Sequence, residues 1–147
     1  MKKTYKSLAI DGPAASGKSV VGRQIAEKLS YVFLDTGLMY RAVTYISINK
    51  KMNPIIVSKF FSTNVFNIKL QDPKNIIHYE KKDITSFLFS NEIDQNVSNI
   101  SKIKEVRGNL VKEQKEISKA NNLVMVGRDI GTKVLPNANL KIYLDAS

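Results

Sequence analysis

The sequence of 147 residues predicts an α/β fold in which a parallel central sheet lies between two layers of helices. Short apolar segments alternate with segments of helical periodicity at both ends of the chain. A glycine-rich loop joins the first apolar segment to the first helical one. The middle of the chain instead alternates apolar and polar residues with a period of two, which predicts a small antiparallel insertion.

The first third of the chain reads as strand, helix, strand and helix. Apolar residues at 7–11 and 31–34 predict two buried strands, because each run is short and ends at turn-forming residues. Helical spacing predicts helices over 19–29 and 38–49, and this order is typical of right-handed parallel crossovers. The apolar face expected of the first helix comprises Val20, Val21, Ile25 and Leu29. That of the second comprises Leu38, Met39, Ala42, Val43 and Ile46.

The middle of the chain predicts an antiparallel hairpin. Residues 65–70 and 75–80 form the two alternating segments, and the turn-like residues 71–74 lie between them. This hairpin would be the centre of an insertion that spans about residues 60–100.

The last third returns to the α/β pattern. One helix is predicted from about Asn91 and a longer one over 102–119, followed by two buried strands at 123–126 and 140–144. A helix that would cover the last strand is missing, so we expect residues 1–147 to be one domain that is C-terminally incomplete.

The composition indicates a globular protein, with 43% hydrophobic and 24% charged residues. The absence of cysteine excludes disulfides and thiolate zinc sites. The chain has no apolar run of membrane-spanning length and no signal-peptide core, so a cytoplasmic location is expected. The net charge of +10 is compatible with a polyanionic partner, but the lysines are scattered and we expect no specific nucleic-acid partner.

Residues 12–19 match the pattern G-x4-G-K-[ST] between a strand and a helix, which is the P-loop motif. Such a loop wraps backbone N–H groups around phosphates, Lys18 reaches the β- and γ-phosphates, and the Ser19 hydroxyl holds Mg²⁺. The motif therefore predicts a P-loop NTPase fold that binds a nucleoside triphosphate and magnesium. The expected nucleotide-binding residues are Gly12, Pro13, Ala14, Ala15, Ser16, Gly17, Lys18, Ser19 and Val20.

Three further clusters lie where an open α/β sheet collects its ligands. Arg41 interrupts an apolar helix face, and a guanidinium in such a place needs an anion unless it is an ordinary surface arginine. Arg128 and Asp129 follow the third parallel strand, where the simpler alternative is an internal ion pair. Ser98 and Arg107 lie on predicted helices, and solvated side chains are the alternative there.

These motifs together resemble the bacterial cytidylate kinase family. The resemblance covers the chain from end to end. The matching segments, in order, are residues 10–18, 34–41, 97–107, 127–136 and 141–147. It implies a kinase of the P-loop type that transfers the γ-phosphoryl group of ATP to CMP or dCMP, with the insertion as part of its monophosphate-binding region. A monomer is expected.

The resemblance also implies roles for individual residues. Arg41 and Arg128 would grip the acceptor phosphate, with Lys18 and Arg128 as the catalytic groups. Ser98, Arg107 and Asp129 would recognise the cytosine base. A carboxylate can accept a hydrogen bond from the exocyclic amino group of cytosine. Asp35 and Thr36 would border the acceptor site, and His78 is assigned no chemistry.

Two departures from the family pattern qualify this interpretation. Family members often have a proline between the positions of Ser98 and Arg107, and this sequence has none there. On one unbroken helix Ser98 and Arg107 would face opposite sides and could not reach the same base. We therefore expect a break in the helix near residues 101–102. The arginine-rich lid of the family is missing. A nucleotide-binding fragment with impaired catalysis, a P-loop kinase of another small acceptor such as shikimate, and a basic nucleic-acid-associated P-loop protein therefore stay open as alternatives.

Overall fold

The computed structural model describes residues 4–70 and 74–145, and the chain divides into two compact units. Unit 1 comprises Met1–Thr36, Leu70–Asn75 and Glu113–Ser147, and unit 2 comprises Gly37–Lys69 and Ile76–Lys112. Each unit is therefore assembled from separate stretches of the sequence. They are described in turn.

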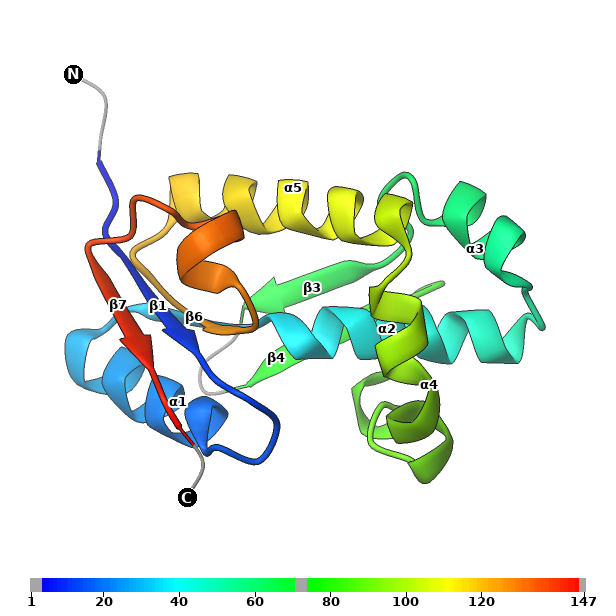
Figure 1. The fold of residues 1–147 in the computed structure, drawn as a ribbon, viewed down its shortest axis with the longest axis horizontal. Helices are drawn as coiled ribbons and strands as arrows, with labels where there is room; N and C mark the ends of the chain where they lie inside the picture. Colours follow the sequence, from blue (N-terminus) through cyan, green and yellow to red (C-terminus); the bar gives the residue numbers. More distant parts are fainter. Residues whose placement is uncertain (1–3, 71–73, 146–147) are drawn as a thin grey trace. The chain divides into compact units, whose positions relative to one another are not determined.

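Unit 1 is built on a four-stranded sheet in the order β2-β6-β1-β7. Its strands are β1 (Ser7–Asp11), β2 (Val32–Asp35), β6 (Leu123–Gly127) and β7 (Leu140–Tyr143). All three pairings are parallel, and Figure 1 shows β1, β6 and β7 side by side. The predicted parallel sheet is confirmed, and its strands lie within one residue or so of the expected positions.

Helix α1 (Lys18–Leu29) packs on this sheet through small residues. The buried residues of α1 are Gly22 and Ala26, and a Cβ atom at position 22 would lie 2.5 Å from Val126 Cγ1. The predicted apolar face is wrong at its ends, because Val20 is 56% exposed and Leu29 is 46% exposed. The helix lies so close to the sheet that only a narrow strip of it is covered. The core cluster of this unit consists of Leu8, Ile10, Ala26, Phe33, Val124 and Val126.

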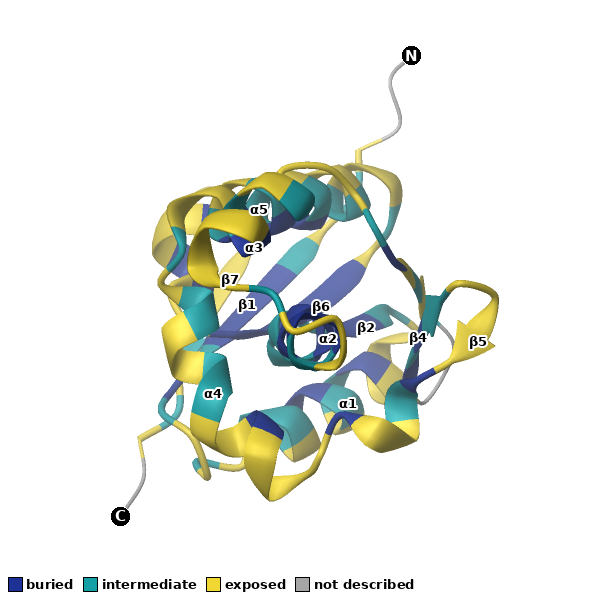
Figure 2. Ribbon diagram, turned by 90° about the vertical axis from the view of Figure 1, so that its right-hand side faces the viewer, coloured by how far each residue is buried: buried dark blue, intermediate teal, exposed yellow. Residues whose placement is uncertain are grey.

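The burial of the strands differs between the centre and the edge of the sheet. Every residue of β6 is buried, as is the middle of β1 (Figure 2). The prediction that the last strand is buried is wrong, since Leu140 is 51% exposed and Tyr143 is 69% exposed. Among the described residues β7 has only β1 as a sheet neighbour, which leaves its other edge and much of its surface open.

Unit 2 is mainly helical. Its elements are α2 (Thr36–Asn49), α3 (Pro54–Phe60), β3 (Asn67–Leu70), β4 (Asn75–Tyr79), β5 (Lys82–Asp83), the short helix η1 (Thr85–Phe87), α4 (Asn91–Ser101) and the first part of α5 (Lys104–Ala120). The five apolar residues predicted to face inward on α2 are all buried. None of the helices in the described part of the chain is both long and apolar enough to cross a membrane.

The predicted insertion is a three-stranded sheet in the order β3-β4-β5. Strands β4 and β5 pair antiparallel, with His78 opposite Asp83. Residues 71–73 of the expected turn lie outside the described residues. The sequence analysis missed β5 and α3. The predicted break is confirmed, because α4 ends at Ser101 and α5 begins at Lys104, and Figure 1 shows the two helices running in different directions.

Candidate functional site

The glycine-rich loop connects the end of β1 to the start of α1. Gly17 is the N-cap of α1 and has a φ of 83°, a left-handed conformation that glycine adopts without steric cost. Gly17 has no side chain with which to cap the first turn of α1, so it leaves the N–H groups of that turn available to a ligand. A helix N-terminus with free amides and a positive dipole end favours an anion.

Lys18 lies within this loop rather than in open solvent. Its Nζ donates a hydrogen bond to the carbonyl oxygen of Pro13 over 3.0 Å. Burial lowers the pKa of Lys18, the Arg128 guanidinium lowers it further, and the carboxylates of Asp35 and Asp11 act in the opposite direction. The lysine is thus a partly desolvated cation that an additional anion would stabilise.

Two serine hydroxyls of the loop differ in their partners. Ser16 Oγ is buried and makes no hydrogen bond with any described residue. A buried hydroxyl without a partner is costly, so this atom has a free donor for a ligand in the loop. Ser19 Oγ instead donates to Asp35 Oδ2 over 3.0 Å.

Asp35 is held at the carboxyl end of β2 by a residue that the sequence analysis missed. The backbone N–H of Asp35 donates to Asn75 Oδ1 over 2.8 Å, and Asn75 Nδ2 donates to the Phe33 carbonyl over 2.7 Å. Asn75 is buried, and nothing in the local sequence distinguishes it from a loop asparagine. Its two hydrogen bonds fix the strand end from which Asp35 projects.

The segment after β6 is arranged around a close approach between Gly127 and Thr36. The buried Thr36 donates its hydroxyl proton to the Val126 carbonyl over 2.9 Å, and a Cβ atom at position 127 would clash with Thr36 Oγ1. Arg128 and Asp129 follow directly and are exposed. Asp129 has a φ of 57° and forms an ion pair with Lys133, with Oδ2 and Nζ 3.9 Å apart.

Arg41 of unit 2 is a partly buried, well-held guanidinium rather than a freely moving one. Its Nη1 donates to the Leu88 carbonyl over 2.9 Å and lies 2.7 Å from Asp94 Oδ1. The guanidinium also lies over the ring of Phe89, 5.5 Å from the centroid. These contacts fix the direction of the side chain, which is 27% exposed.

The break between α4 and α5 changes the direction of Arg107. Its Nη1 donates to the carbonyl oxygen of Ser101 over 3.4 Å, so the guanidinium turns back toward the end of α4. Ser98 is exposed on that same helix. The break therefore brings the Arg107 side chain to the end of the helix that carries Ser98.

The predicted residues thus fall into two groups, one in each unit. Unit 1 holds the loop together with Asp35, Thr36, Arg128 and Asp129, and unit 2 holds Arg41, Ser98 and Arg107. Within the described ranges, no group of three or more acidic, histidine or cysteine side chains could enclose a metal ion.

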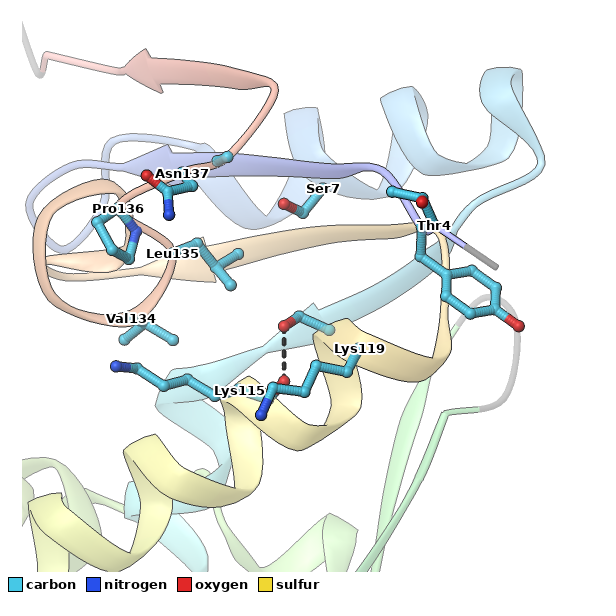
Figure 3. A pocket seen from close by; sticks show the side chains of 11 residues that line it. Thr4, Ser7, Lys115, Lys119, Val134, Leu135, Pro136 and Asn137 are labelled. Carbon is cyan, nitrogen blue, oxygen red and sulfur yellow. Dashed lines mark hydrogen bonds between the residues drawn. The ribbon is translucent and has the colours of Figure 1, made fainter. Parts of the chain in front are cut away.

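A surface pocket of about 740 Å³ lies at the opposite end of β1 from the glycine-rich loop (Figure 3). It is lined by the start of the chain, the second half of α5 and the segment that joins β6 to β7. The lysines 115 and 119 border it, and it contains none of the residues predicted from the sequence.

Comparison with known proteins gives a consistent result over the whole chain. A model of the cytidylate kinase family matches residues 8–147. A cytidylate kinase of Streptococcus pyogenes serotype M1 is 43% identical over 144 residues, which cover 95% of this chain and 64% of that protein. The cytidylate kinase of Caldicellulosiruptor bescii is 43% identical over 151 residues, which cover 100% of this chain and 66% of that protein. The chain therefore spans slightly less than two thirds of the length of these relatives.

Proposed function

The chain belongs to the cytidylate kinase family, and we propose that it transfers the γ-phosphoryl group of ATP to CMP or dCMP, which yields ADP and CDP or dCDP. The observation that carries the proposal is the phosphate loop at the end of β1. It combines uncapped amides at the N-terminus of α1, a partly desolvated Lys18 and the Ser16 hydroxyl, which has no hydrogen-bond partner among the described residues. All three favour a polyanion over water.

In the proposed donor site the loop binds the phosphates of ATP. Backbone N–H groups of residues 12–19 would surround the β-phosphate, and Lys18 would leave the Pro13 carbonyl to reach the β- and γ-phosphates. Binding of the phosphates would return to Lys18 the favourable charge interactions that burial removed. Ser16 would donate its free hydroxyl proton to a phosphate oxygen.

Magnesium fits the pair formed by Ser19 and Asp35. A hydroxyl and a carboxylate are oxygen ligands of the kind that Mg²⁺ prefers, and the ion usually takes its remaining ligands from phosphate and water. Ser19 and Asp35 would therefore hold the ion. When bound, magnesium neutralises charge on the phosphates.

In the proposed acceptor site, Arg41 and Arg128 bind the phosphate of CMP. Arg41 is already oriented by Asp94, the Leu88 carbonyl and Phe89, so little side-chain entropy is lost when it binds an anion. Arg128 is exposed and follows the strand next to the phosphate loop. Holding two polyanions in line under such positive charge is most of what phosphoryl transfer requires.

The base would be read by Asp129, Ser98 and Arg107. The Asp129 carboxylate accepts a hydrogen bond from the exocyclic amino group of cytosine, whereas uracil has a carbonyl at that position and would be repelled. Ser98 and Arg107 supply donors for the ring acceptors. Discrimination would then rest on the Asp129 carboxylate, which can accept a hydrogen bond from cytosine but not from uracil at that position.

The test is ADP production from Mg-ATP with CMP, dCMP, UMP, AMP or no acceptor, with Lys18→Ala as the blank. We expect turnover with CMP and dCMP only, and none in the variant. Turnover with a different acceptor would overturn the substrate assignment. ATP binding without any turnover would identify the chain as a nucleotide-binding fragment of the family.

A further inference from the structure

Asp11 joins the end of β1 to the segment that follows Arg128 and Asp129. Its Oδ1 accepts a hydrogen bond from the backbone N–H of Ile130 over 2.6 Å, and its Oδ2 accepts one from Gly131 over 2.9 Å. The two partners are 119 and 120 residues away in the sequence. Both carboxylate oxygens are thus used within unit 1.

These two amides need an acceptor from outside their own segment. They begin η2 (Ile130–Val134), a single turn of π-helix, and the first N–H groups of a helix have no partner within it. The residue at its N-cap, Asp129, makes no capping hydrogen bond with its side chain. The Asp11 carboxylate takes the place of that cap from a neighbouring strand, where Asp11 pairs with Gly127.

The anchored amides lie directly after the two residues proposed to bind CMP. Asp129 has a left-handed φ of 57°, a conformation that is uncommon outside glycine and needs support from its surroundings. Strand β6 holds the chain before Arg128, and Asp11 holds it after Asp129. The backbone of the pair is therefore fixed at both ends, although both side chains are exposed.

We propose that Asp11 is a positioning residue, whose bidentate hydrogen bond to the Ile130 and Gly131 amides orients Arg128 and Asp129 for binding of CMP. The inference rests on the proposed function. Asp11 touches no substrate in this scheme. It acts through the backbone conformation at residues 128 and 129.

The charge of Asp11 gives a way to separate this role from a general loss of structure. The carboxylate stands close enough to the phosphate loop to act on Lys18. Replacement of Asp11 by asparagine removes a negative charge near the triphosphate site, which lowers electrostatic repulsion of ATP. The same replacement leaves one of the two amides without an acceptor and loosens residues 128 and 129. The two nucleotides should therefore respond differently.

The experiment compares Asp11→Asn with the unchanged protein by calorimetric titration of CMP and of ATP, and by amide hydrogen exchange in NMR. In the variant we expect CMP to bind at least about tenfold more weakly, because Arg128 and Asp129 are then less well oriented before CMP binds. ATP should bind within about twofold of the unchanged protein or more tightly. The amides of Ile130 and Gly131 should exchange at least about tenfold faster, while those of Val124 and Val126 keep their protection.

Asp83→Asn is the matched control. Asp83 is also a carboxylate that accepts a backbone N–H, from Thr85 over 2.9 Å, and it lies in unit 2 outside the proposed site. This variant should leave both affinities unchanged. A difference in CMP affinity between the two variants then shows that the effect depends on where Asp11 lies, and not on the loss of any carboxylate that accepts a backbone N–H.

Each other outcome counts against the inference. Faster exchange at Ile130 and Gly131 with unchanged CMP affinity would show that the anchor does not position the site. Equal weakening of CMP and ATP, with lost protection at Val124, would show a general structural role only. Absence of CMP binding in the unchanged protein would refute the proposed function and the inference with it, while loss of CMP binding in the variant alone concerns only the inference.

Discussion

The Ser19 hydroxyl donates a hydrogen bond to the Asp35 carboxylate, with Oγ and Oδ2 3.0 Å apart. This bond connects the first turn of α1 to the carboxyl end of β2. The sequence analysis associated Asp35 with the acceptor and Ser19 with the metal. Their contact gives Asp35 a second proposed role, as a carboxylate that shares the magnesium ion with Ser19.

Asp35→Asn tests that second role. We expect Mg²⁺ to raise the affinity for ATP in the unchanged protein and to have at least a tenfold smaller effect in the variant, because an amide is a weaker magnesium ligand than a carboxylate. Calorimetric titration of ATP with Mg²⁺ and with a chelator measures both affinities. An equal magnesium effect in the two proteins would exclude Asp35 as a ligand.

Lys18→Met should separate stability from function. Burial lowers the pKa of Lys18, which means that the folded state disfavours the charged form of this side chain. The charged lysine therefore destabilises the folded state at neutral pH, and the free energy of unfolding rises as the pH rises toward the ordinary pKa of 10.5. At neutral pH an uncharged side chain of similar length removes that cost, so the melting temperature without ATP should stay the same or rise by about 2 °C. The increase in melting temperature on adding Mg-ATP should disappear. A lower melting temperature without ATP would contradict the argument.

Gly127→Ala should destabilise the protein by about 2–3 kcal/mol, because the new methyl group clashes with Thr36 Oγ1. Thr36→Ala alone removes the buried hydrogen bond to the Val126 carbonyl and should cost about 1–2 kcal/mol. In the double variant the clash is relieved, so the total should fall at least 1 kcal/mol below the sum. Urea unfolding of all four proteins gives this coupling energy, and strict additivity would show that the clash is relieved elsewhere.

Glu113→Gln should make the protein more stable at neutral pH. Burial raises the pKa of Glu113 above its ordinary value of 4.5, so the folded state keeps its proton to higher pH than the unfolded state does. The free energy of unfolding therefore falls as pH rises from 4.5 through the pKa of the folded state. The variant should gain up to about 1 kcal/mol at pH 7 and nothing at about pH 4.

The control for this prediction is Glu105→Gln on the same helix. Glu105 is exposed in the first turn of α5, where a negative charge interacts favourably with the helix dipole. Its replacement should be neutral or slightly destabilising, by about 0.5 kcal/mol. Equal stabilisation by both replacements would point to net charge rather than to the burial of Glu113.

The sequence predicted most of the sheet because its strands combine short apolar runs with turn residues at their ends. It missed α3, although Asn53 and Pro54 form a good start signal: Asn53 Oδ1 accepts the Ile56 N–H over 2.9 Å, and proline occupies the first turn. The periodicity of α3 extends over only seven residues, which is too short to stand out. Helix η2 has no local signal at all, since the carboxylate that caps it comes from Asp11.

The phosphate loop could be predicted because its motif is local, with fixed spacing and a known strand–helix context. The parts that support it depend on contacts between distant residues. Asn75 holds the end of β2 from another segment of unit 1, and Arg41 is fixed by Asp94. The spacing of residues along the sequence does not reveal such pairs. The edge position of β7 likewise depends on sheet order, which apolar content does not reveal.

The strand order also determines when the phosphate loop can form during synthesis. Strand β1 is made before both of its neighbours, because it begins at Ser7 whereas β6 and β7 begin at Leu123 and Leu140. Among the residues that the structure describes, β2 pairs only with β6, so neither β1 nor β2 has a described sheet partner until the ribosome has passed residue 123. Contacts between residues so far apart in the sequence form late in folding, because the chain loses the entropy of a long loop before these contacts stabilise it. The glycine-rich loop is therefore translated before the strands that flank β1 and is completed only after them, and a nascent chain that ends before β6 should have no affinity for nucleotide.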